Sequence, residues 1–319
     1  MLIRTLAGLA AALVASSASV AAPQDCQLMR IEEWTVRLDR NLPVIDGEIN
    51  NQKVGILLDT GAERSLMTRS AAARLMLSRY DVAATRMYTV TDKPIEAVRI
   101  DDLRIGTAKR SNWAVLLAPE HDFGGDIGLI LGRDFFDKVD VELDFANRAM
   151  RLYQPKNCEG AMLAYWAKNG ASEVALESGS PTFTVSVNGR QMRAQLDTGA
   201  TVSALTTVDA ARFGVTPKGA GVNAAGCSLG LGRKAVDYWS ASFESFAIGN
   251  EVIRSPTLRF GDLFKESAPF ADLPQMVLGV DFLRAHRVYV AQSQRKLFFT
   301  YTGGTVFPAD AAKGCHDLR

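Results

Sequence analysis

The chain has 319 residues, of which 47% are hydrophobic and 22% are charged, and its formal net charge is +1. This composition is ordinary for a globular protein, and the length suffices for one large or two ordinary domains. Lysine and arginine are scattered, with no block of five like charges. The charge pattern therefore gives no electrostatic basis for binding nucleic acid or an anionic surface.

The N-terminal segment differs from the rest of the chain. Arg4 is the only charged residue before Asp25, and residues 6–22 are apolar or small. This pattern is typical of a secretory signal peptide with cleavage near residues 19–21. A membrane anchor is the alternative, but the apolar run is short for a span of about 20 residues. We predict a signal peptide at residues 1–22, export, a periplasmic location in a Gram-negative source, and no membrane span after cleavage.

A strand-like segment that ends in Asp-Thr-Gly-Ala occurs twice, at residues 56–62 and at residues 194–200. Asp197 follows Asp59 by 138 residues, and the same offset aligns apolar and turn residues on both sides of the two aspartates, without a gap, over residues 34–68. In each copy the small residues after the strand allow a tight turn that leaves one carboxylate at its tip.

A second block repeats further along the chain, at residues 130–136 and at residues 277–283. Gly279 follows Gly132 by 147 residues; because the offset at the aspartates is 138, the second copy is nine residues longer between its two blocks. Two matched blocks in the same order indicate an internal repeat in which each copy is one structural unit.

Local patterns predict mainly strands in both copies. Alternating apolar and polar residues flank turns rich in asparagine and glycine, which is typical of β-hairpins. Hairpins are predicted at residues 44–58, 139–153, 182–196 and 287–301. Helix formers that follow a polar start predict short helices at residues 70–77 and 208–213, and a further short helix is expected at residues 161–168.

The repeat also predicts the domain organisation. The signal peptide at residues 1–22 precedes a first lobe at residues 23–157. Residues 158–172 interrupt the repeat and form a linker, and residues 173–319 form a second lobe with a C-terminal tail. Each repeated unit is strand-rich and of ordinary domain size.

Two apolar residues before Asp-Thr-Gly-Ala, followed later by two apolar residues before Gly-x-Asp, resemble the retropepsin-like aspartic proteases. The pieces are residues 57–62 with 130–134 in the first copy, and residues 195–200 with 277–281 in the second. The resemblance covers nearly all of the chain after the signal peptide, twice. It implies a mainly β fold of two tandem retropepsin-like (acid protease) β-barrel lobes related by a pseudo-twofold axis.

In this family each lobe contributes one catalytic aspartate, so the resemblance implies a dyad of Asp59 and Asp197. Two carboxylates about 3 Å apart cannot both ionise readily, so they share one proton. The ionised member takes a proton from a water molecule, and the protonated member donates to the scissile carbonyl oxygen. The resemblance therefore implies an aspartic endopeptidase, a hydrolase whose activity peaks on the acidic side.

Four supporting residues follow from the same resemblance. Thr60 and Thr198 are expected to hydrogen-bond across the pseudo-twofold axis and hold the two loops together. Gly61 and Gly199 are expected to let the backbone approach and to direct amides at the carboxylates.

Family members also carry a hairpin flap over the substrate. Its place in this chain would be near Met87–Pro94 in the first copy and near Asn223–Gly232 in the second, and the nine extra residues are expected in or beyond the second flap region. Arg133 fits the family's Gly-Arg-Asp pattern, whereas Val280 stands at the matching position. These differences predict an asymmetric cleft.

The four cysteines are Cys26, Cys158, Cys227 and Cys315. An even number in an exported protein favours disulfides, and none of these cysteines forms a CxxC motif. Of the three possible pairings we expect Cys26–Cys158 and Cys227–Cys315, because each bridge would close one repeat.

Other interpretations are compatible with the same residues. Asp59 and Asp197 could each cap a turn, which would leave a non-catalytic module that binds peptides or envelope proteins. The lobes could also pair between chains, although we expect a monomer whose lobes pair internally. Asp134 and Asp281 are interpreted as structural, and the three histidines lack metal-ligand spacing. We expect a peptide or protein substrate, no cofactor or metal, and no nucleic acid partner.

Overall fold

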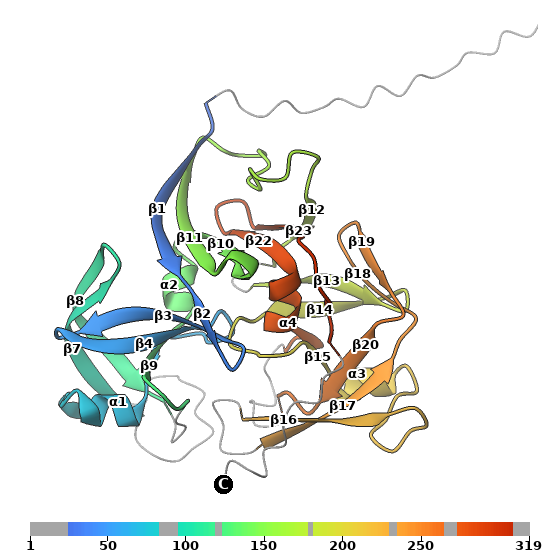
Figure 1. The fold of residues 1–319 in the computed structure, drawn as a ribbon, viewed down its shortest axis with the longest axis horizontal. Coiled ribbons are helices and arrows are strands. Elements are labelled where there is room, and N and C mark those ends of the chain that lie inside the picture. The colour runs from blue at the N-terminus through green and yellow to red at the C-terminus, as the bar shows by residue number, and fades with distance from the viewer. Residues whose placement is uncertain are drawn as a thin grey trace, which may run out of the picture.

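The computed structural model describes residues 25–82, 95–118, 123–177, 181–229, 235–264 and 273–308. The predicted signal peptide, the first flap candidate and Cys315 lie outside the described residues. The described chain is mainly β, with its strands in three sheets (Figure 1). None of its helices is long and apolar enough to cross a membrane.

The first lobe is a closed β-barrel. Its elements are β2 (Arg37–Asp39), β3 (Leu42–Ile49), β4 (Gln52–Leu58), β5 (Leu66–Met67), α1 (Arg69–Arg74), β6 (Arg79–Val82), β7 (Ile95–Ile105), β8 (Ala108–Leu117) and β9 (Ile127–Leu131). The strands pair in the order β3-β4-β9-β5-β8-β7, and β7 returns to pair with β3. This closure leaves no free edge within the ring of six strands.

The second lobe repeats the same strand order. Its elements are β13 (Thr182–Val187), β14 (Arg190–Leu196), β15 (Ala204–Thr206), α3 (Thr207–Ala211), β16 (Asn223–Leu229), β17 (Ala235–Ser242), β18 (Ser245–Ile248), β19 (Glu251–Arg254), β20 (Thr257–Gly261) and β21 (Met276–Leu278). β18 pairs with β13 where β7 pairs with β3. The long β7–β8 hairpin is therefore divided into four strands here, and Pro256, which has no amide hydrogen, stands at the break before β20.

The strand registers locate the nine extra residues of the second copy. Tyr80 pairs with Ala97, and Asn223 pairs with Ser240, so the offset between the lobes is 143 residues here. It is 138 at the aspartates and 147 at the glycine motifs, so five extra residues lie between Thr206 and Asn223, and four between β20 and β21. Five of the nine therefore precede the β16–β17 hairpin, and the expectation that they lie in or beyond the flap region is wrong for these five. A largely exposed loop accepts such an insertion at little cost.

The two lobes share a third, six-stranded sheet. Its strands and the helices that lead into it are β1 (Gln27–Thr35), α2 (Arg133–Phe136), β10 (Asp140–Asp144), the 3-10 turn η1 (Phe145–Asn147), β11 (Ala149–Lys156), β12 (Ser172–Ala175), α4 (Val280–Ala285), β22 (His286–Ala291) and β23 (Lys296–Tyr301). The order β1-β11-β10-β22-β23-β12 places β10 of the first lobe beside β22 of the second (Figure 1). Val141 lies opposite Val290 and Leu143 opposite Val288. Equivalent residues thus pair reciprocally, as a pseudo-twofold axis requires.

One face of this sheet carries a buried ion cluster that joins the lobes. Glu142 on β10 accepts from Arg151 at 2.5 Å, from Arg287 Nε of the second lobe at 2.9 Å and from the Tyr165 hydroxyl at 2.8 Å. The Glu142 carboxylate is fully buried. Removal of one partner of such a cluster is strongly destabilising, because it leaves a buried charge uncompensated.

The helix predicted at residues 161–168 is wrong, because the structure has only turns and irregular chain there. The side-chain amide of Gln294 donates to the carbonyl oxygens of Cys158 and Ala161, at 2.6 and 3.0 Å. Trp166 lies partly buried against Tyr289. So short a stretch has little helical stability of its own, so tertiary contacts set its conformation.

The other predicted elements form. All four hairpins are present, and the helices predicted at residues 70–77 and 208–213 are α1 and α3. Thr68 and Thr206 cap them, with the hydroxyl of each accepting an amide hydrogen of the first turn. The predicted Cys26–Cys158 disulfide is confirmed. Cys227 is disulfide-bonded as well, but its predicted partner lies outside the described residues.

Candidate active site

Asp59 directly follows β4 and is buried where the first lobe meets the second. The end of β4 runs parallel to β9, and the Asp59 amide donates to the Leu131 carbonyl at 3.0 Å. The chain then turns, and the amides of Gly61 and Ala62 both donate to Asp59 Oδ1, each at 2.9 Å. These bonds fix one carboxylate oxygen at the tip of the turn.

Asp197 has the same setting at the end of β14. Its amide donates to the Leu278 carbonyl at 2.9 Å, since β14 runs parallel to β21. The amides of Gly199 and Ala200 donate to Asp197 Oδ1 at 2.8 and 3.2 Å. The matched sequences therefore fold into matched carboxylate turns.

Two threonines interlock these turns across the lobe boundary. Thr60 Oγ1 donates to the Leu196 carbonyl at 2.9 Å and accepts from the Thr198 amide at 3.1 Å. Thr198 Oγ1 donates to the Leu58 carbonyl at 2.7 Å and accepts from the Thr60 amide at 2.9 Å. Both threonines are buried, so these reciprocal bonds are shielded from competition with water.

The glycines show how closely the two acids approach. A Cβ atom added at Gly61 would lie 2.4 Å from Asp197 Cγ, and one added at Gly199 would lie 2.5 Å from Asp59 Cγ. Each carboxyl group therefore lies against the glycine of the opposite lobe. Only a residue without a side chain fits there, and this steric limit explains why both positions are glycine.

The two carboxyl groups perturb each other's ionisation. Burial raises the pKa of Asp59, and the negative charge of Asp197 with the hydrogen bond between the two acids raises it further, to about 8, although the amides of Ala62 and Gly61 oppose the shift. Burial also raises the pKa of Asp197, opposed by the Gly199 amide and by the hydrogen bond from Asp59. The pair therefore keeps a proton near neutral pH, and this proton belongs to the pair as a whole.

A serine and a second aspartate support each turn from behind. In the first lobe the amide and hydroxyl of Ser65 donate to Asp134 Oδ1 at 2.8 and 2.7 Å, and the Ser65 hydroxyl accepts from the Gly132 amide at 3.0 Å. This bonding ties the Asp59 loop to the start of α2.

In the second lobe the amide and hydroxyl of Ser203 donate to Asp281 Oδ1 at 2.8 and 2.5 Å, and the hydroxyl accepts from the Gly279 amide at 2.9 Å. The match of Ser65 with Ser203 was visible in the sequence, but the sequence could not supply their role. Their partners lie about 70–80 residues away, and only the pairing of the repeated blocks could have suggested them.

The lobes differ just behind the turns. Arg133 Nη2 forms an ion pair with the exposed Glu63 at 3.6 Å, whereas Val280 at the matching position is fully buried. In the second lobe a buried arginine, Arg259 on β20, lies 3.7 Å from Asp281. Sequence reasoning missed Arg259, because its position in a strand gives no local sign of a charged partner.

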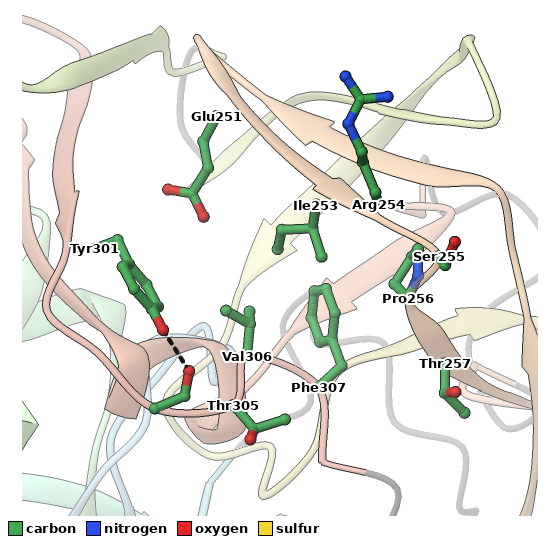
Figure 2. A pocket seen from close by; sticks show the side chains of 11 residues that line it. Glu251, Ile253, Arg254, Ser255, Pro256, Thr257, Tyr301, Thr305, Val306 and Phe307 are labelled. Atoms are coloured by element: carbon green, nitrogen blue, oxygen red, sulfur yellow. Dashed lines mark hydrogen bonds between the residues drawn. The ribbon is translucent and has the colours of Figure 1, made fainter.

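A pocket of about 660 Å³ lies elsewhere on the second lobe, between β19, the start of β20 and the segment after β23 (Figure 2). Its lining includes Glu251, Ile253, Tyr301 and Phe307, and none of its lining residues belongs to either aspartate turn. Beside it the buried His286 contacts the Glu251 carboxylate at 2.9 Å. Among the described residues there is no group of three or more potential metal-ligating side chains.

The second flap candidate is part of the β16–β17 hairpin. β16 ends at Leu229 and β17 begins at Ala235. Residues 230–234 lie outside the described residues, as does the first candidate at Met87–Pro94. The flap assignments stay predictions.

Comparisons with known proteins identify the family and the fold. A family model of aspartyl proteases matches residues 45–135 and residues 183–282, one region in each copy. An aspartic proteinase from Irpex lacteus is similar in structure, with a TM-score of 0.51 and 11% identity over 85% of this chain and 97% of that chain, which agrees with the predicted fold. A retropepsin-like aspartic protease from Rickettsia conorii has a TM-score of 0.29 and 16% identity, over 42% of this chain and 97% of that chain. No curated protein matches.

Proposed function

The chain belongs to the aspartyl protease family, and from this premise we propose that it is an aspartic endopeptidase that hydrolyses peptide bonds with water activated by Asp59 and Asp197. The observation that carries the proposal is that each buried carboxyl group lies against the glycine of the opposite turn, where burial raises the pKa of both acids. Perturbed carboxyl pairs of this kind are a frequent mark of catalytic sites.

The roles of the two acids follow from their shared proton, since the pKa of each is raised by burial beside the other. The protonated member of the pair donates to the scissile carbonyl oxygen. The ionised member takes a proton from the attacking water. Thr60 and Thr198 keep the two turns in register, and Gly61 and Gly199 let the acids approach each other.

The proposal includes location and assembly. We propose export to the periplasm after removal of residues 1–22, with lobes at 23–157 and 173–319 joined by residues 158–172. The Cys26–Cys158 disulfide fits an oxidising compartment. A monomer fits the threonine interlock and the shared six-stranded sheet, because both already join the two lobes of a single chain.

The test uses Asp59→Asn and Asp197→Asn in the mature chain, with Asp46→Asn on the exposed surface as a matched control. We expect each dyad variant to lose at least about a thousandfold in cleavage of an unfolded protein substrate, while its circular dichroism spectrum and melting stay those of a folded protein. The control should cleave like the wild type.

Full activity in either dyad variant would refute the catalytic role. Binding of unfolded protein without turnover in the wild type would instead favour the alternative, a non-catalytic module that binds peptides or envelope proteins. A statine-type transition-state mimic separates the two cases, because it should bind tightly only where the dyad can stabilise a tetrahedral centre.

A further inference from the structure

The second lobe has a buried cation, Arg259, at a position where the first lobe has Leu116. Arg259 pairs in register with Ala204, directly after Ser203. In the first lobe Leu66 corresponds to Ala204, and its register partner is Leu116, an aliphatic residue. The barrels match in strand order, so this difference is a substitution of charge at one position of a shared framework.

Arg259 faces the aspartate that supports the Asp197 turn. The side chains of Arg259 and Asp281 are only 5% and 3% exposed, and Arg259 Nη1 lies 3.7 Å from Asp281 Oδ2. The other carboxylate oxygen accepts from the amide and hydroxyl of Ser203 and from the Phe282 amide at 2.8 Å. One oxygen therefore holds the loop and the start of α4, while the other faces the guanidinium.

A carboxylate buried to this extent needs a counter-charge. Burial raises the pKa of Asp281, and the hydrogen bonds from Ser203 and Phe282 together with the charge of Arg259 act against that rise. Asp134, the equivalent aspartate of the first lobe, is only partly buried.

We propose that Arg259 is a positioning residue for Asp197: it keeps Asp281 ionised, and the ionised carboxylate holds the Ser203 end of the turn that carries Asp197. Without the guanidinium, Asp281 takes up a proton in the folded protein. An acid OH is a poorer acceptor for the Ser203 amide and hydroxyl, so the turn loosens and Asp197 loses its alignment with Asp59. This role rests on the proposed function, because alignment matters only if the dyad acts.

The first experiment measures stability and needs no activity. Arg259→Leu gives the second lobe the residue of the first, Arg259→Lys keeps the charge, and Arg259→Leu/Asp281→Asn removes both charges. The unfolded chain releases the Asp281 proton above about pH 4, whereas the folded leucine variant retains it. The melting temperature of Arg259→Leu should be lower than that of the wild type, and this deficit should be about 5–10 °C larger at pH 8 than at pH 4.5.

The matched control is Arg193→Leu, which removes a partly exposed ion pair with Glu177 from the same lobe. This control and the double variant should show no such pH-dependent deficit, and Arg259→Lys should recover most of it. A deficit of equal size at both pH values, or one that persists in the double variant, would overturn the proposal.

The second experiment tests the link to Asp197. We expect Arg259→Leu to lower kcat at least about tenfold with KM within about twofold, and Arg259→Lys to restore most of kcat. In carbon-13 NMR of aspartate-labelled protein, the titration of Asp197 should change in the leucine variant and return in the lysine variant. A wild type without turnover would contradict the proposed function, and the Asp197 titration would then be the sole test of the role of Arg259. An Asp197 titration that is unchanged in the leucine variant would overturn the proposed role of Arg259.

Discussion

The two lobes are alike where they meet and unlike behind that surface. At the shared site each aspartate accepts hydrogen bonds from the amides two and three residues later in its own turn. Each threonine donates to a carbonyl of the opposite lobe. Behind it, the first lobe has the ion pair of Arg133 with exposed Glu63, and the second has buried Val280 and the pair of Arg259 with Asp281. Symmetry is thus held where the lobes pack against each other, because a change there would disturb both halves at once.

The largest effect is expected from breaking the symmetric contact. Gly61→Ala and Gly199→Ala each force a Cβ atom within 2.5 Å of the opposite carboxyl carbon, so the acids must move apart. We expect each variant to lose at least about a hundredfold in kcat/KM, and the two losses to agree within about threefold. A peptide-cleavage assay measures this. Asp46→Asn on the exposed surface is the control, and a large difference between the two test variants would show that the glycines are not equivalent.

The next effect concerns pH and the shared proton. The pKa of Asp59 is raised to about 8 in the folded protein, whereas an unfolded aspartate titrates near 4. Between these values the unfolded chain releases a proton that the folded dyad keeps, so stability should fall as pH rises from about 4 to about 8. Asp59→Asn should remove much of this fall and melt several degrees above the wild type at pH 8.

Melting curves from pH 4 to pH 8 test this, with Asp46→Asn as the surface control. The same pKa limits activity, since the dyad must retain its proton, so turnover should decline as pH rises through about 8. A wild type whose melting temperature is equally high at both ends of the range would show that the dyad does not hold the proton.

Removal of the serine hydroxyl behind each turn should destabilise the two lobes by different amounts. Ser65→Ala and Ser203→Ala each remove a hydroxyl that bridges an aspartate and a glycine amide. We expect losses of about 1–2 kcal/mol for the first and about 2–3 kcal/mol for the second, because Asp281 is more deeply buried and depends more on its remaining donors. Urea unfolding measures both. Equal losses would mean that the burial of Asp281 does not matter for this contact.

The smallest effect is expected at the ion pair of Arg133 with Glu63. Glu63→Gln removes this pair at the partner whose side chain is 84% exposed, and it leaves the largely buried Arg133 in place. Solvent screens such a pair, so the loss of stability should be under about 1 kcal/mol. The same unfolding assay applies, and a loss as large as that of Ser203→Ala would show that this pair contributes more than an exposed ion pair does.

Much of the fold followed from local pattern. The hairpins and two helices of the lobes were predictable because turn residues, alternation and capping threonines act over a few neighbouring residues. The helix expected at residues 161–168 was wrong because contacts to Gln294 and Tyr289, more than a hundred residues away, decide that segment. The nine-residue difference was countable from the sequence, but its division into five and four required the register of β6 and β16.

The sequence by itself determined the twofold repeat and the two Asp-Thr-Gly-Ala turns at Asp59 and Asp197, because matching short motifs in the same order are read directly from the chain. It left three cysteine pairings open, and the structure confirmed the expected Cys26–Cys158 bridge. Only the tertiary structure decided that each carboxyl lies against the opposite glycine, that burial raises the pKa of both acids, and that Arg259 faces Asp281. These properties depend on contacts between residues far apart in sequence and on exclusion of water, and neither is encoded in any local pattern.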